Sequence, residues 1–476
     1  MTRQKNRLWG SQEIELATGG TWINPPARGW VASGVSYRLK DIKKGDLVIA
    51  VGPDGWCSRM TDTSKKISAL YHAGSCAVVS ACVPSNLLPD QPFLKVDETL
   101  TAFQGLARHA RDRFQGKAIC VTGSAGKTST MKALHHVLSR QAPTWASPRC
   151  TNNRFGVMEG LARTPSGHSY GLYEFGLFRP GDVKHMSMIT RPHVAVITTI
   201  HAAHLSNFQS VAHIAESKAE IFSGMDNDGI AVLNCDDPYF FRLCRQAQKL
   251  GIKNIRSFGK NIRADVCLVS SKSDEWGSHV EVKVRRRRFF FYIPFAGAHW
   301  ISNMLAVLCV VDAVGGDLTQ ALWDLEDFKL PGGRGARYTI AFKGKSFELL
   351  DDSYNATVVS MRNGLDILGM TQPSQGGHRI AVLGDIAHLG DDTTALHVEL
   401  AEYIKAAKVD RLFTVGEGMR HLRQTVPPHV RAFHGETAQQ LLPAIWNELN
   451  PGDVVLVKGS FPSRVSEIAH ALRSGQ

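Results

Sequence analysis

Residues 119–132 place a glycine-rich turn between a short apolar run and a helical pattern, the arrangement that a nucleoside triphosphate requires. Glycines 123 and 126 let the backbone approach phosphate oxygens, and the following helix directs its N-terminal N–H groups at them. Lys127 supplies a point charge, and the hydroxyl of Thr128 is a ligand for Mg²⁺. The segment therefore predicts a phosphate-binding loop whose nucleotide contacts are Gly123, Ser124, Gly126, Lys127, Thr128 and Ser129.

The spacing of this loop departs from the common phosphate-loop pattern. Val121 occupies the position where the longer motif has its first glycine. The alternative is a chance glycine-rich turn, which the apolar run before it and the helical pattern after it disfavour.

A carboxylate at the end of a second apolar run is a candidate metal ligand. Glu174 ends such a run between Tyr173 and Phe175, and α/β sheets bind ligands at the carboxyl ends of their strands. Because Mg²⁺ prefers oxygen ligands and keeps several waters, Thr128 and Glu174 are the ligands that we predict. A surface carboxylate with no ligand is the alternative for Glu174.

Lys218 flanks the apolar face of a predicted helix. Ile214 and Ala215 precede it, and Ile221 and Phe222 follow, at helical spacing. By itself this pattern is that of a lysine lying along its own helix with its charge in solvent.

The elements that must position these residues alternate along the chain. Strand-like runs at 118–122, 194–199 and 230–234 alternate with helix-like stretches at 128–140 and 211–223. This alternation predicts βαβ units and a mostly parallel sheet. The segment 330–335 predicts a linker, and strands at 346–351, 379–384, 411–415 and 453–458 alternate with helices beyond it.

Length and pattern predict three α/β regions. A chain of 476 residues is too long for one ordinary core. We expect domains over residues 1–115, 116–330 and 331–476, the second with the nucleotide motif. The first shows short β-like runs at 47–51 and 76–79 around a helix-like stretch near 64–74, with no nucleotide motif.

Composition limits the class of protein. Hydrophobic content of 43% and charged content of 21% are typical of a soluble globular chain, and no apolar run approaches the length of a membrane span. The N-terminal residues are not followed by a secretory core, so we expect a cytoplasmic location and no membrane partner. Nine cysteines without a Cys-x-x-Cys pair favour reduced thiols.

The net charge of +12 raises the possibility of nucleic-acid binding. The four arginines at 285–288 lie between two β-like runs, which favours the solvated turn of a hairpin, and no RNA-binding motif accompanies them. We therefore expect no nucleic-acid partner and a general attraction for anionic substrates.

Taken in order, the motifs resemble those of the Mur ligase family, and most resemble the members that add D-alanyl-D-alanine to the muramyl tripeptide. No single block is as specific as the series over residues 119–464. The blocks are Thr122 to Thr128, Asn152-Asn153, Glu174-Phe-Gly, Ala203-His204-Leu205, Lys218 to Phe222, Leu233 to Pro238, Gly297 to Asn303, Asp351 to Ala356, Leu383-Gly-Asp and Val457 to Ser460.

The resemblance implies an N-terminal substrate domain, a central ATPase and a mobile C-terminal Rossmann-like domain. It implies ATP and Mg²⁺ as cofactors, a second metal ion held by His204, and a carbamylated Lys218. It further implies ATP contacts from Asn303, Arg334 and Asp352. The implied catalytic residues are Lys127, His204 and Lys218, and the implied substrate contacts are Asn152, Asn153, Asn355 and Lys458. For Arg334 a hinge role, for Asn355 an Asx turn and for Lys458 a strand cap remain as alternatives. For His204 the alternative is a histidine hydrogen-bonded within the core, which the residue taken alone favours.

The departures from the family concern mostly the substrate regions. Where the family has Ser-x-Asp-Ser-Arg for the uridine nucleotide, this chain has Ser36-Tyr37-Arg38-Leu39-Lys40. The other departures are Ser206-Asn207, Trp300, Thr357-Val358 and His388. They favour a divergent member of the family that uses an acyl donor other than the muramyl peptide.

The predicted function is an ATP-dependent ligase that joins a carboxylate to an amino acid or dipeptide, releases ADP and phosphate, and acts as a monomer. The cell-wall enzyme itself is one alternative, and an unrelated phosphate-loop ATPase or kinase is another. A third alternative, a catalytically inactive binding protein, is disfavoured by Lys127, Thr128, Glu174, His204 and Lys218.

Overall fold

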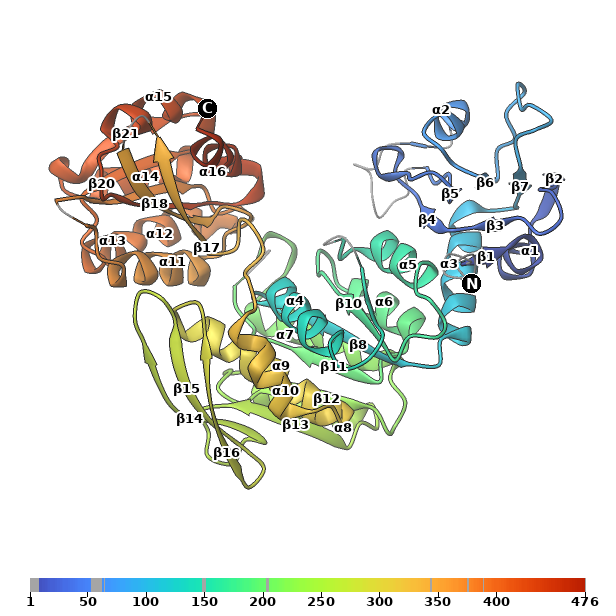
Figure 1. The fold of residues 1–476 in the computed structure, drawn as a ribbon, viewed down its shortest axis with the longest axis horizontal. Helices are drawn as coiled ribbons and strands as arrows, with labels where there is room; N and C mark the ends of the chain where they lie inside the picture. Colours follow the sequence, from blue (N-terminus) through green and yellow to red (C-terminus); the bar gives the residue numbers. More distant parts are fainter. Residues whose placement is uncertain are drawn as a thin grey trace.

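The computed structural model describes residues 8–52, 62–63, 65–147, 151–202, 205–342, 345–374, 376–387 and 389–475. Figure 1 shows three bodies, of which the blue N-terminal and the red C-terminal ones lie to either side above the green and yellow central one. Their main sheets have five, nine and six strands from the N-terminus to the C-terminus. Three α/β bodies with largely parallel sheets confirm the predicted fold class, whereas the exact boundaries at 115 and 330 stay predictions.

The central nine-stranded sheet holds the phosphate loop. Its order is β16-β15-β14-β13-β12-β11-β8-β10-β9, parallel from β9 to β14 and antiparallel through β15 and β16. The strands are β8 (Lys117–Thr122), β9 (Thr144–Ala146), β10 (Tyr170–Glu174), β11 (Val194–Ile197), β12 (Ile230–Asn234), β13 (Asn254–Gly259), β14 (Val266–Ser273), β15 (Ser278–Val284) and β16 (Arg287–Ile293).

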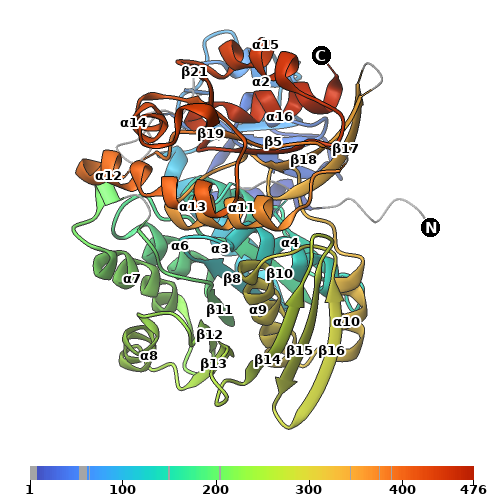
Figure 2. The same ribbon diagram turned by 90° about the vertical axis from the view of Figure 1, so that its left-hand side faces the viewer.

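Helices cover both faces of this sheet, because β8 alternates its apolar side chains between two cores. Ala118 and Cys120 enter one core, while Ile119 and Val121 enter the other. The first face packs α5 (Arg154–Ala162), α6 (Asp182–Thr190), α7 (Val211–Ala219) with η3 (Glu220–Gly224), and α8 (Phe240–Lys249). The second packs α4 (Lys127–Leu138), α9 (Ala298–Val314) and α10 (Leu318–Glu326), and Figure 2 shows α9 and α10 beside the long strands β14 to β16. The short turn η2 (Leu205–Asn207) precedes α7.

The N-terminal body shares its core with the first face of the central sheet. Val35, Leu47 and Phe103 belong to the same buried cluster as Phe155 of α5. The five-stranded sheet has the order β2-β7-β6-β5-β4, and β1 pairs with β3. Its elements are β1 (Trp9–Gly10), α1 (Ser11–Thr18), β2 (Thr21–Asn24), β3 (Val31–Ala32), β4 (Gly34–Ser36), η1 (Leu39–Asp41), β5 (Asp46–Ile49), α2 (Ile67–His72), β6 (Ala77–Ser80), β7 (Phe93–Lys95) and α3 (Thr99–Arg113).

The C-terminal body has two cores of its own, one on each face of its sheet. The order β17-β18-β22-β19-β20-β21 is parallel except for the β17–β18 hairpin. The strands are β17 (Ala336–Phe342), β18 (Lys345–Asp352), β19 (Arg379–Gly384), β20 (Arg411–Val415), β21 (Arg431–Gly435) and β22 (Val454–Lys458). The helices are α11 (Val358–Met370), α12 (Thr393–Val398), α13 (Leu400–Ala406), α14 (Glu417–Thr425), α15 (Ala438–Glu448) and α16 (Val465–Ser474), with short turns η4 (Gly390–Asp392), η5 (Pro428–Val430) and η6 (Phe461–Ser463).

The sequence patterns located most elements within a few residues. The runs predicted at 230–234, 379–384 and 411–415 are β12, β19 and β20 at the same bounds. The helix predicted at 211–223 is α7 followed by the tighter turn η3. The segment 330–335 lies between α10 and β17, as a linker should.

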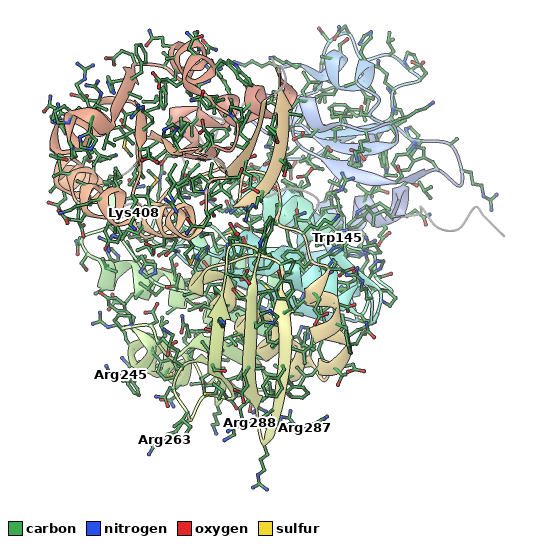
Figure 3. The ribbon with its side chains drawn as sticks, turned by 60° about the vertical axis from the view of Figure 1, so that its left-hand side comes forward. Trp145, Arg245, Arg263, Arg287, Arg288 and Lys408 are labelled. Atoms are coloured by element: carbon green, nitrogen blue, oxygen red, sulfur yellow. The ribbon has the colours of Figure 1, made fainter. Side chains whose placement is uncertain are left out.

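The arginine run turns a hairpin, as predicted, but the turn is shorter than the run. Arg285 and Arg286 connect β15 to β16, with Arg285 in the left-handed region at φ 54°, and the next two arginines begin β16. Figure 3 shows Arg287 and Arg288 at the far end of the hairpin. Arg285 contacts Asp312 and Arg288 contacts Glu281, so two of the four charges are partly compensated.

The described ranges contain neither a membrane-spanning helix nor a disulfide. No helix there is both long and apolar enough to span a bilayer. The seven cysteines that the structure describes are free thiols.

Candidate active site at the phosphate loop

The loop between β8 and α4 has the backbone that its glycines allow. Gly123 has φ 151° and Gly126 φ 81°, values at which a side chain is strained. A Cβ on Gly123 would lie 1.9 Å from Oγ1 of Thr198, and one on Gly126 would lie 2.4 Å from Oδ1 of Asn303. Gly126 caps α4 at its N-terminus, so the first N–H groups of the helix face the loop.

Lys127 folds back over the loop. Its Nζ donates to the carbonyl of Gly123 at 2.7 Å, which holds the ammonium where phosphate oxygens approach. Burial lowers the pKa of Lys127, the Glu174 carboxylate opposes that shift, and the nearby Arg334 guanidinium adds to it. Lys127 and Arg334 therefore bring two cations to one place, as polyanion binding requires.

The two predicted magnesium ligands meet directly. The hydroxyl of Thr128 donates to Oε2 of Glu174 at 2.7 Å, although 46 residues separate them. Asn152 Nδ2 donates to the other carboxylate oxygen, Oε1, at 2.9 Å. Thr128 and Glu174 are both buried, at the ends of α4 and β10 that face the loop. This set of oxygens fits Mg²⁺, which takes one or two protein ligands and completes its shell with phosphate and water.

Lys218 is a buried lysine without a counter-ion in the described part of the chain. Its side chain on α7 is 3% exposed, and among the described residues it makes no ion pair. Burial lowers its pKa well below the ordinary value, and Lys127 lowers it further. The alternative of a lysine with its charge in solvent therefore does not hold, because the side chain is buried at the wall of a cavity.

Sequence reasoning missed Thr198, which follows β11 and anchors the loop. Its Oγ1 donates to the carbonyl of Ala125 at 2.5 Å. Ser124 is held similarly, since its N–H donates to the carbonyl of Thr199 at 2.8 Å and its hydroxyl donates to the carbonyl of His201. The signal that could have located Thr198 was its position just after an apolar strand of a parallel sheet.

The predicted C-terminal contacts gather at the ends of β18 and β22. Asp352 and Lys458 are register partners on these strands, and Lys458 Nζ lies 2.5 Å from Asp352 Oδ2. The same ammonium donates to the carbonyl of Asn355 at 3.3 Å. Burial raises the pKa of Asp352, and Lys458 opposes that shift. Arg334 stacks on Tyr354, 4.2 Å from its ring centre.

One cavity of about 340 Å³ joins the phosphate loop to the C-terminal body. Gly123, Lys127 and Lys218 line it from the central body. Asn355, Thr357, Ser460 and Phe461 line it from the C-terminal body. The cavity thus collects the loop, the buried lysine and the ends of β18 and β22.

Other predicted site residues have structural partners. Asn153 caps α5 by accepting from the N–H of Gly156 at 2.8 Å, and Ser129 is buried in the first turn of α4. His204 lies outside the described residues, as does His388. Two of the departures have local roles, because Trp300 packs edge-on against Phe295 and Thr357 caps α11.

The basic residue that replaced an acidic one in the N-terminal body is also paired. Arg38 Nε lies 2.5 Å from Asp41 Oδ2, within the turn η1. Its guanidinium also lies 5.5 Å from the ring centre of Tyr37, which packs on Phe155. The charge change that favoured a divergent acyl donor is thus largely compensated inside the chain.

Fold and site together define a nucleotide-dependent enzyme with a phosphate loop and a C-terminal body that completes its cleft. Comparison with known protein families identifies the class of enzyme more closely. The pattern described as "Mur ligase middle domain" matches residues 121–311, and the one described as "Mur ligase, glutamate ligase domain" matches residues 337–461.

Curated relatives and solved structures match over most of the chain. The UDP-N-acetylmuramoyl-tripeptide–D-alanyl-D-alanine ligase of Escherichia coli is 30% identical over 81% of this chain and 83% of its own. The ligase of the same name from Rickettsia prowazekii is 28% identical over 97% of this chain and 99% of its own. A crystal structure of MurF from Acinetobacter baumannii superposes with a TM-score of 0.83 at 25% identity, covering 98% of this chain and 99% of that one. A MurF ligase from Thermotoga maritima, solved with ADP, has the same fold, with a TM-score of 0.76 at 24% identity over 93% and 97% of the two chains.

The chain belongs to the Mur ligase family. It is an ATP-dependent, ADP-forming amide ligase that uses Mg²⁺. The predictions of family, enzyme class, ATP and Mg²⁺ are confirmed. The unrelated ATPase and the inactive binding protein are thereby set aside.

Proposed function

We propose that this ligase joins the terminal carboxylate of a UDP-N-acetylmuramoyl-peptide to the amine of a D-alanyl dipeptide. The observation that supports this best is the one cavity that Lys127, Lys218 and the C-terminal body line together, with Asn152 in its wall hydrogen-bonded to Glu174. Full-length similarity to ligases of that name supports the substrate pair. The pairing of Arg38 with Asp41 removes the main argument for a different donor.

The reaction has two steps in which charge accumulates. A carboxylate oxygen of the donor attacks the γ-phosphorus of ATP, the bond to the bridging oxygen breaks, and ADP leaves an acyl phosphate behind. The neutral amine of the acceptor then attacks the acyl carbon, the amide bond forms, phosphate leaves, and the amine releases a proton. Lys127, the helix α4 N-terminus and Arg334 face the phosphate charge in both steps.

We assign individual contacts on the same geometry. Thr128 and Glu174 hold Mg²⁺, which when bound neutralises phosphate charge. Asn152 orients Glu174, and Asn303 supports the loop at Gly126. Gly123, Ser124, Gly126 and Ser129 contribute loop and helix N–H groups to phosphate. Asp352 and Lys458 act as a pair at the nucleotide edge of the cleft, beside Asn355. The proposed roles of Asn153 at the substrate and His204 at a second metal rest on the family resemblance alone.

Lys218 is proposed to be carbamylated. Carbamate formation needs a neutral amine, whose nitrogen attacks CO₂ and then releases one proton to solvent. Burial lowers the pKa of Lys218 and so favours the neutral amine at neutral pH. The product is an anion, which attracts the nearby ammonium of Lys127. A protonated Lys218 would instead repel that ammonium.

The test is amine-dependent release of ADP. With UDP-N-acetylmuramoyl-tripeptide, Mg·ATP and D-alanyl-D-alanine, we expect stoichiometric ADP, phosphate and amide product. Omission of either the donor or the dipeptide is the control. Amide formation with another carboxylate but not with the muramyl peptide would replace the proposed donor.

A further inference from the structure

An exposed aromatic side chain stands on the C-terminal wall of the cavity. Phe461 begins η6 directly after the Lys458-Gly459-Ser460 end of β22, and 71% of its surface is exposed. Leaving a phenyl group in water forfeits much of the free energy that its burial would provide. A single exposed aromatic residue is ordinary, so the neighbours of Phe461 decide whether it has a role.

Two more partly exposed aromatic residues line the same cavity. Phe178 follows β10 in the central body and is 46% exposed, and Tyr354 follows β18 and is 39% exposed. Leu177, Ala356 and Ile386 also line the cavity. Together with Phe461, apolar side chains from four separate segments therefore meet at the place where phosphate chemistry is expected.

The charges of the cavity are confined to its phosphate end. Among the described residues that line it, Lys127 and Lys218 are the only charged ones, and none is acidic. The C-terminal wall around Phe461 has neither a cation nor an anion among these residues, so an ammonium or a carboxylate on the acceptor side chain finds no counter-ion there, and burying an unpaired charge is costly. A neutral apolar group meets no such penalty.

We propose that Phe461 is a specificity-determining residue that contacts an apolar side group of the acceptor dipeptide, beyond its reacting amine. This inference rests on the proposed function and refines its acceptor. It implies that the second residue of the dipeptide can be larger than alanine when it is apolar, and that a charged side chain there is rejected.

The experiment compares four acceptors with one donor. The parent enzyme is assayed with UDP-N-acetylmuramoyl-tripeptide, Mg·ATP and D-alanyl dipeptides ending in D-alanine, D-leucine, D-lysine or D-aspartate. We expect kcat/KM for D-alanyl-D-leucine to exceed the values for the lysine and aspartate dipeptides by about tenfold or more, the effect of one good apolar contact. Phe461→Ala should remove most of that preference through KM, and Phe461→Leu should retain it. Calorimetric binding of the dipeptides should change in parallel.

Phe290→Ala is the matched control, because Phe290 is 73% exposed on β16 and does not line the cavity. Unchanged selectivity in Phe461→Ala would overturn the inference. An equal change in KM for every dipeptide and for ATP would also overturn it, because that result is expected if Phe461 only helps the bodies to close. Absence of ADP release by the parent with every acceptor would instead contradict the proposed function, and the inference with it.

Discussion

Lys127 is the residue on which nucleotide turnover depends most directly. Its ammonium lies over the loop at the carbonyl of Gly123, where it contributes charge more than packing. We expect Lys127→Ala to lower kcat/KM for ATP by on the order of 10²-fold or more, because a preorganised electrostatic contact is lost. Steady-state ADP release measures the effect, and an unchanged circular dichroism spectrum is the control. Near-normal turnover in a folded variant would remove the phosphate-loop assignment.

The proposed carbamate at Lys218 makes the functional charge at this residue negative, whereas that of Lys127 is positive. If the residue functions as a carbamate, Lys218→Ala should be inactive and should regain part of its activity when formate or acetate refills the anionic position. Lys127→Ala is the matched control, because a lost cation is not replaced by a carboxylate. Full activity of Lys218→Ala, or an unmodified Lys218 in the electron density of active enzyme crystallised with bicarbonate, would contradict the carbamate.

At the scale of elements, local motifs were predictable and distant pairings were not. The phosphate loop lies within 14 consecutive residues, 119–132, so its types and spacing were sufficient. Asp352 and Lys458 were predicted as separate contacts, yet the buried Lys458 and the half-buried Asp352 form one ion pair because a crossover places β22 beside β18. Phe461 carries no local signal, since an exposed phenylalanine after a strand acquires its meaning only from the segments across the cavity.

The N-terminus of α9 brings a pH-sensitive group to the junction of two bodies. Burial lowers the pKa of His299 to about 3, and Lys458 contributes. Because the folded-state pKa lies below the ordinary 6.5, the unfolded chain binds this proton first as the pH falls. The neutral His299 side chain therefore makes its full contribution to the free energy of unfolding above pH 6.5. That contribution is lost as the pH falls from 6.5 toward 3, by at most about 1.4 kcal/mol per pH unit.

We therefore expect His299→Gln to lose less thermal stability than the parent between pH 7 and pH 5. Melting temperatures at both pH values measure this, and His279→Gln on the exposed face of β15 is the control. An equal pH-dependent loss in parent and His299→Gln would show that His299 is not kept neutral by burial.

At the scale of the whole molecule, the three bodies are joined unequally. The N-terminal body shares a buried core with the central one, whereas the C-terminal body has cores of its own. The tip of the β14–β15 hairpin provides a polar contact between the central and C-terminal bodies. Arg337 of β17 donates to the carbonyl of Glu275 at 2.5 Å and stacks on Trp276, 4.4 Å from its ring centre. The N–H of Gln372 donates to the Glu275 carboxylate at 3.2 Å.

This contact should hold the C-terminal body in the arrangement that forms the cavity. Arg337→Met removes the hydrogen bond and the ion pair to Glu275 and the cation–π contact with Trp276, and it also removes the ion pair with Glu348 inside the C-terminal body. The contacts across the junction are together worth about 1–2 kcal/mol at a partly exposed site. We expect small-angle scattering of Arg337→Met to show a larger radius of gyration and the KM for the dipeptide to rise, because the phosphate loop and the Phe461 wall belong to different bodies. Arg288→Met is the control, since Arg288 pairs with Glu281 inside the same sheet. Identical scattering curves and KM values for parent and Arg337→Met would mean that the linker at 330–335 and the other contacts around the cleft set the orientation of the C-terminal body without the hairpin.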